Sequence, residues 1–180
     1  MKIWFRGGPE VDKEVIEKFG KDCEALSEGK YDSWQEQPYN CLAGILIGDQ
    51  LTRNVYRDSP KMYVNDDRVL AWAKALVASG ADKNYKPIER VWIYMPYMHH
   101  EDVADQEECM RLFEGLGEEC RQCEGGEPLV TMTELNVKYA GLHRDVVAKW
   151  GRFPHRNALL GRASTPEEEA GLLDGSIQRF

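Results

Sequence analysis

Apolar residues recur at intervals of three and four along most of the chain, which is the period of amphipathic helices. The clearest stripes cover residues 9–29, 40–56 and 65–80, and the first and third end at a glycine. No stretch shows the period-two alternation of a half-buried strand. The pattern predicts an all-α fold, a single compact domain over residues 1–180 built from six to eight helices.

Proline, glycine and capping residues mark the ends of the later helices. Pro96 is expected to end a fourth helix, and a fifth is expected over residues 98–116. Thr131 or Thr133 fits the start of a sixth helix. Residues 165–168 have the order of a threonine cap, a proline and a capping glutamate, which predicts a last short helix.

Three of the expected helices place polar side chains on their apolar stripes. Asp49 and Arg53 continue a leucine stripe of the second helix, at the i, i+4 spacing of an ion pair. His99 and Gln106 do so in the fifth helix, and His143 in the sixth. Because burying unpaired polar groups is costly, these side chains should contact one another, water or a ligand. A structural hydrogen-bond network, a ligand pocket and a solvated face all remain open.

The segment of residues 151–162 holds three arginines, a histidine and an asparagine within twelve positions. These residues are Arg152, His155, Arg156, Asn157 and Arg162. A solvated loop rarely carries so many planar donors, and arginine and histidine suit carboxylate or phosphate groups. The segment is therefore predicted to be the centre of a polar site.

Composition narrows the classes of partner. The 180 residues have a formal net charge of −8, which disfavours binding to nucleic-acid backbones. No run approaches the roughly 20 apolar residues that span a bilayer, and the first residues lack the apolar core of a signal peptide. Cys120 and Cys123 form a C-x-x-C pair without further ligands at zinc spacing, so reduced thiols are expected. We expect a soluble cytoplasmic protein with no metal or cofactor.

Three segments resemble a known bacterial family. They cover residues 42–57, 94–106 and 143–162, and both Trp4-Phe5 and residues 165–168 also fit. Together they are similar to the uncharacterised proteins catalogued as domain of unknown function 924, over nearly the whole chain. The resemblance implies a helical, tetratricopeptide-like fold and no particular reaction.

The chain departs from the family pattern at several positions. Gly48 stands where the family usually has leucine, His100 where it has serine, and Trp150 where it has phenylalanine. Gly48 should soften the second helix, and His100 adds a titratable group. The positions that match the family motifs are Asp49, Gln50, Arg53, Asn54, Arg57, His99, Glu101, Asp105, Gln106, His143, Arg152, His155, Arg156, Asn157 and Arg162.

The first functional hypothesis is a pocket for a small anionic or phosphorylated ligand. His99, Glu101 and His143 are the candidate catalytic residues, because histidine titrates near neutral pH and Glu101 can orient it. Glu101 and Asp105 lie one turn apart, and a solvated helix face is the alternative for both. The candidate ligand-binding residues are Asp49, Gln50, Arg53, Asn54, Arg57, Asp105, Gln106, Arg152, His155, Arg156, Asn157 and Arg162.

Two alternatives belong to other classes. A tetratricopeptide-like fold suggests a module that binds a protein partner on a concave surface, an analogy at the level of the fold. A metal-dependent hydrolase would draw on the histidines and carboxylates of residues 99–105 and on His143. The order of these residues does not match the usual helical hydrolase pattern. The sequence does not specify whether a reaction takes place.

Overall fold

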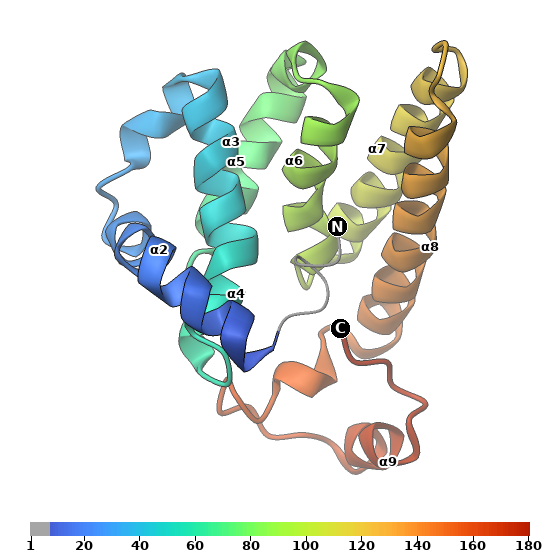
Figure 1. The fold of residues 1–180 in the computed structure, drawn as a ribbon. Helices are drawn as coiled ribbons and strands as arrows, with labels where there is room; N and C mark the ends of the chain where they lie inside the picture. The colour runs from blue at the N-terminus through green and yellow to red at the C-terminus, as the bar shows by residue number, and fades with distance from the viewer. Residues whose placement is uncertain (1–7) are drawn as a thin grey trace. The chain divides into compact units, whose positions relative to one another are not determined.

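The computed structural model describes residues 8–180, so Trp4 and Phe5 lie outside the described residues. Within this range every regular element is helical and none is a strand, which confirms the all-α prediction (Figure 1). The α-helices are α2 (Pro9–Ser27), α3 (Pro38–Leu46), α4 (Thr52–Val55), α5 (Asp66–Ser79), α6 (Pro87–His99), α7 (Val103–Arg121), α8 (Glu127–Trp150) and α9 (Pro166–Asp174). Of these described helices, none is both long enough and apolar enough to cross a membrane.

The chain divides into two compact units, Met1–Pro96 and Tyr97–Phe180. The boundary falls inside α6, at its proline. Each unit has buried apolar residues of its own. The single domain over residues 1–180 stays a prediction.

The core of the first unit lies between α2, α3 and α5. Cys23 and Leu26 of α2, Ile45 of α3 and Val69 of α5 are all fully buried. The backbone of α3 approaches α5 closely at Gly44, where an added Cβ would lie 2.3 Å from Cζ3 of Trp72. Glycine at this position is what allows the two helices to pack so near to each other.

The predicted second helix is continuous but irregular. A π-helical turn, Ile47–Leu51, joins α3 to α4, and it contains both Gly48 and Asp49. The hydroxyl of Thr52 donates to the carbonyl of Ile47 at 2.8 Å within this turn. The irregularity therefore includes a predicted site residue, Asp49, and π-helical turns are frequent at functional sites.

The second unit is organised around the pair α7 and α8, which run antiparallel and are joined by residues 122–126 (Figure 1). Phe113 and Leu116 of α7 and Ala140 of α8 are fully buried in it. After α8 the chain turns at Gly151, and Phe153 packs into a cluster with Val146 and Val147. This contact brings the arginine-rich segment against the end of the helical pair.

Two predicted boundaries around residue 96 are wrong. Pro96 lies inside α6, which continues to His99, because a proline removes one helical hydrogen bond without preventing the next turn. The following helix begins at Val103, capped by the Asp102 carboxylate, which accepts the N–H groups of Ala104 and Asp105. His99 therefore belongs to α6, and it does not share a helix with Gln106.

The predicted cap of the sixth helix is also wrong. The helix α8 begins at Glu127, with Pro128 in its first turn. Thr131 and Thr133 lie inside it, and their hydroxyls donate to the carbonyls of Glu127 and Val130. The last helix, α9, is confirmed, including the capping box between Thr165 and Glu168.

Candidate functional site

The predicted site residues fall into two groups, one in each unit. The first unit contains Asp49, Gln50, Arg53, Asn54 and Arg57. The second contains His99, Glu101, Asp105, Gln106, His143, Arg152, His155, Arg156, Asn157 and Arg162.

In the first unit, Arg53 is held mainly by Asp66. Its Nη1 and Nη2 atoms donate to the two carboxylate oxygens of Asp66, each at 3.0 Å. The predicted i, i+4 pair with Asp49 is present at 3.9 Å, and Arg53 also donates to the Asp49 carbonyl at 2.6 Å. Asp49 is buried, and its Oδ2 accepts from Gln50 at 2.6 Å. The sequence pattern does not indicate Asp66, which starts α5, as the partner of Arg53.

Asn54 and Arg57 bind one carboxylate of α2. Asn54 donates to Asp12 at 2.8 Å, and Arg57 donates to it through Nε at 2.5 Å and Nη2 at 2.8 Å. The hydrogen bond from Arg57 is the main reason that the pKa of Asp12 lies below its ordinary value. These contacts join α4 and the turn after it to α2, so both side chains have a structural partner inside their own unit.

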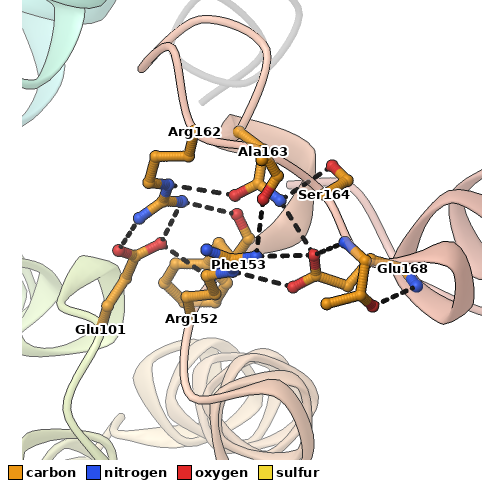
Figure 2. A network of polar contacts seen from close by, with 9 residues as sticks. Glu101, Arg152, Phe153, Arg162, Ala163, Ser164 and Glu168 are labelled. Carbon is orange, nitrogen blue, oxygen red and sulfur yellow. Dashed lines mark hydrogen bonds and ion pairs between the residues drawn. The ribbon is translucent and has the colours of Figure 1, made fainter.

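In the second unit, Glu101 anchors the segment after α8. Arg162 donates to both of its oxygens, through Nη1 at 2.5 Å and Nη2 at 3.0 Å, and the Phe153 N–H donates at 2.7 Å (Figure 2). Burial raises the pKa of Glu101, but the hydrogen bonds from Arg162 and the Phe153 N–H lower it by more than burial raises it. The pKa of Glu101 is therefore below its ordinary value. Glu101 is therefore an ionised anchor for Arg162 and the backbone of Phe153.

A second carboxylate, Glu168 of α9, completes this network. Arg152 donates to its two oxygens at 2.8 and 2.7 Å, and Asn157 and the Thr165 N–H donate at 3.2 and 2.8 Å (Figure 2). The Arg152 guanidinium is the main cause that lowers the pKa of Glu168 to about 2. Arg162 also donates to Oδ1 of Asn157 at 3.0 Å, which links the two carboxylates. We call this set the Glu101–Glu168 network.

Three of the predicted ligand-binding residues belong to the Glu101–Glu168 network. Arg152, Arg162 and Asn157 all bind carboxylates or amides of the protein itself. Their main contribution is to fix the conformation of residues 151–165. This agrees with the structural hydrogen-bond network that was one of the alternatives.

A different cluster forms around the ring of Phe153. The Cζ atom of Arg156 lies 4.4 Å from the centre of that ring, and His143 and His155 each lie 5.7 Å from it between ring centres. His99 lies 6.1 Å from His143 on the same measure. We call His143, Phe153, His155 and Arg156 the His143 cluster. It combines one buried guanidinium with two imidazoles around an apolar ring.

Both imidazoles of the cluster are neutral at neutral pH. Burial, followed by the influence of His99 and then Arg156, lowers the pKa of His143 to about 3. Burial and then Arg156 lower the pKa of His155 to about 4, with Glu101 acting in the opposite direction and Arg179 and Arg162 adding to the decrease. The Nδ1 atom of His143 lies 2.8 Å from the Tyr139 carbonyl, so Nδ1 carries the proton and donates, leaving Nε2 as the acceptor.

These lowered pKa values predict that stability decreases in acid. A histidine in the unfolded chain binds a proton near its ordinary pKa of 6.5, whereas folded His143 does so only near pH 3. The contribution of neutral His143 to the free energy of unfolding is therefore fully present above about pH 6.5, and it is lost as the pH falls toward 3. Between about pH 7 and pH 5, we expect His143 alone to contribute roughly 1–2 kcal/mol of this loss.

The measurement is the free energy of unfolding in urea at both pH values, for the wild type and for His143→Gln. The variant should lose about half of the pH dependence, because His155 still titrates. A pH dependence that is the same in both proteins would show that His143 is not held neutral by the fold.

The remaining predicted residues, Asp105 and Gln106, support the start of α7. Asp105 accepts from Nδ1 of His100 at 2.6 Å, so the histidine that it orients is His100. Gln106 donates through Nε2 to the carbonyls of Met98 and His100 at 2.7 and 2.6 Å. It thereby satisfies carbonyl groups at the end of α6 that have no helical partner.

Two residues of this region were missed or underestimated. Glu168 was expected only as a capping residue, although the capping pattern did place it at the start of α9. Phe180 was not foreseen, and its ring stacks on His143 with ring centres 3.5 Å apart. Nothing in the local pattern of the sequence points to that contact. Among residues 8–180, no three histidine, cysteine, aspartate or glutamate side chains come together as metal ligands.

The fold and the site thus define a class of all-helical proteins whose arginine- and histidine-rich segment is anchored by two carboxylates, the half-buried Glu101 and the buried Glu168. The chain belongs to the family of bacterial proteins of unknown function DUF924, whose family model matches residues 1–176. None of the curated proteins matches its sequence.

One solved structure supports the same fold. The chain is similar to a protein of unknown function, ATU0120, from Agrobacterium tumefaciens, with 31% sequence identity and a TM-score of 0.79. The similarity covers 96% of this chain and 89% of the Agrobacterium chain. The family resemblance seen in the sequence motifs is therefore confirmed.

Proposed function

We propose that the protein binds a small anionic or phosphorylated ligand at the His143 cluster of its second unit. The observation that supports this most is the buried Arg156 guanidinium, which lies 4.4 Å from the centre of the Phe153 ring beside the buried His143 and the half-buried His155. Arg156 lowers the pKa of both His143 and His155, and Arg179 and Arg162 lower that of His155 further. An anion placed beside these groups would be stabilised by the same charges that disfavour a protonated histidine.

The proposal assigns recognition, and not proton transfer, to His143. General acid–base catalysis is most effective when the pKa lies near the working pH, and a pKa of about 3 is far from neutral. A bound anion would raise the pKa of both imidazoles, and binding would then be accompanied by proton uptake. Affinity for the anion should therefore increase as the pH falls from neutral toward about 4, the pKa of His155 in the unliganded protein. We also propose that the protein binds this ligand in the cytoplasm.

The test is a thermal-shift screen with phosphate monoesters, nucleotides and dicarboxylates. At about one hundred times its dissociation constant, a ligand should add roughly 2.7 kcal/mol of stability. We expect this shift to disappear in Arg156→Gln and to be partly retained in Arg156→Lys, which keeps the charge. Arg144→Gln is the matched control, because Arg144 lies beside His143 in the sequence and its guanidinium pairs with Asp145.

An equal shift in Arg156→Gln and in the wild type would contradict the proposal. So would a screen in which no anion stabilises the protein. The second outcome would favour the alternative, a module that binds a protein partner.

A specific feature supports that alternative: an open groove of about 460 Å³ in the first unit, lined by the aromatic residues Tyr39, Trp72 and Tyr85. Tyr39 is 68% exposed there and is available to a partner.

A further inference from the structure

The ring of Phe180 lies in a slot formed by three other rings. It stacks on His143 with ring centres 3.5 Å apart and planes inclined by 21°. It meets Phe153 and His155 edge-on, with ring centres 5.9 and 6.0 Å away. We call the space bounded by His143, Phe153 and His155 the aryl slot. Its walls are suited to a planar ring, because stacked and edge-on contacts are the preferred geometries of aromatic pairs.

The residues just before Phe180 are held by contacts of their own. Ile177 is buried and its N–H donates to the Gly171 carbonyl at 2.9 Å, and Arg179 donates to the Leu172 carbonyl at 3.2 Å. Phe180 lies beyond these contacts, and its side chain remains 41% exposed. Movement of the Phe180 ring out of the slot would therefore leave the hydrogen bonds of Ile177 and Arg179 in place.

The aryl slot shares a wall with the positive charge of the His143 cluster. Phe153 forms one side of the slot, and the same ring lies 4.4 Å from the guanidinium carbon of Arg156. A planar ring in the slot would thus lie one side chain away from that charge. A molecule that carries an anionic group on an aromatic ring matches both features together.

We infer that the aryl slot is the ring-binding half of the proposed anion site, that the ligand is an aryl anion such as an aryl phosphate or an aromatic carboxylate, and that Phe180 occupies the slot in its absence. The inference rests on the proposed function and adds the chemical class of the ligand. It also implies that the Phe180 ring competes with the ligand for the aryl slot. Emptying the slot should raise the fraction of molecules that can accept a ring and so lower the apparent dissociation constant.

The experiment compares phenyl phosphate with inorganic phosphate by isothermal titration calorimetry. In the wild type, phenyl phosphate should bind about tenfold more tightly, which corresponds to roughly 1.4 kcal/mol. In Phe180→Ala, phenyl phosphate should bind roughly three- to tenfold more tightly than in the wild type. Inorganic phosphate should be unaffected, because it does not need the slot.

Two further variants make the comparison specific. Leu173→Ala removes a side chain of the same region that is 91% exposed, and it should leave both dissociation constants unchanged. Phe180→Leu keeps an apolar side chain without a planar ring and should give an intermediate affinity for phenyl phosphate. Thermal unfolding curves of all three variants establish that each is folded under the conditions of the titration.

The outcomes separate this inference from the proposed function. If both phosphate compounds bind equally well, or if Phe180→Ala behaves like Leu173→Ala, the aryl slot is not part of the ligand site and the inference is wrong. If neither compound binds the wild type or Phe180→Ala, the proposed anion site is itself wrong.

Discussion

Replacing Glu168 with alanine should lower the free energy of unfolding by roughly 2–4 kcal/mol. The side chain is 2% exposed and accepts from Arg152, from Asn157 and from the Thr165 N–H. Alanine removes the acceptor for all three groups at once and ends the capping box of α9. The largest part of the cost comes from the buried Asn157 amide and the half-buried Arg152 guanidinium, which lose an acceptor.

The measurement is urea unfolding of Glu168→Ala beside Glu169→Ala. Glu169 lies in the same turn but is exposed, so its loss should change stability by less than about 1 kcal/mol.

Because the pKa of Glu168 falls from 4.5 to about 2 in the folded protein, its stabilising effect is complete above about pH 4.5 and is lost as the pH falls toward 2. The two variants should therefore converge in acid. Equal stability of both variants at neutral pH would show that the network does not hold α9.

Replacing Gly48 with leucine should destabilise the first unit by roughly 2–4 kcal/mol. An added Cβ would lie 2.4 Å from Cγ1 of Val69 and 3.1 Å from Cδ2 of Leu26. Both neighbours are fully buried and cannot move aside without disturbing the core.

Gly115→Ala is the matched control for this substitution. Gly115 also lies inside a helix, α7, but an added Cβ meets no atom within 4 Å. Alanine should be neutral there or add up to about 1 kcal/mol, because it is the better helix former. Thermal unfolding of both variants checks the contrast. A Gly48→Leu variant as stable as Gly115→Ala would mean that the turn at Ile47–Leu51 is not packed against α5 as described.

The helices could be predicted from the sequence because their apolar period and several of their caps are local signals. The glycine that ends α5 and the capping box of α9 are read from adjacent residues. The sequence predicted that the fourth helix ends at Pro96, and the reason that it continues lies elsewhere in the chain. Gln106, which lies in the next helix, satisfies the carbonyls of Met98 and His100, and this lets α6 end three residues after its proline.

The candidate site was predictable in its composition but not in its pairing. The density of arginine and histidine in residues 151–162 did indicate a polar cluster. It did not indicate that Arg152 and Arg162 bind Glu168 and Glu101, because those partners lie in other helices or connections. The stacking of Phe180 on His143 likewise depends on how the chain returns after α9. Side-chain partners of this kind are set by the tertiary fold and leave no periodic trace.

The long span between Glu101 and Arg162 has a consequence for the order of folding. These residues are 61 positions apart, whereas α7 and α8 are consecutive and are joined by residues 122–126. Contacts that close long loops form late because their entropic cost must first be met by local structure. We therefore expect the pair α7 and α8 to form the folding nucleus of the second unit, with residues 151–165 docking onto it last. Weakening the Glu101 contact should then speed unfolding and leave the folding rate almost unchanged.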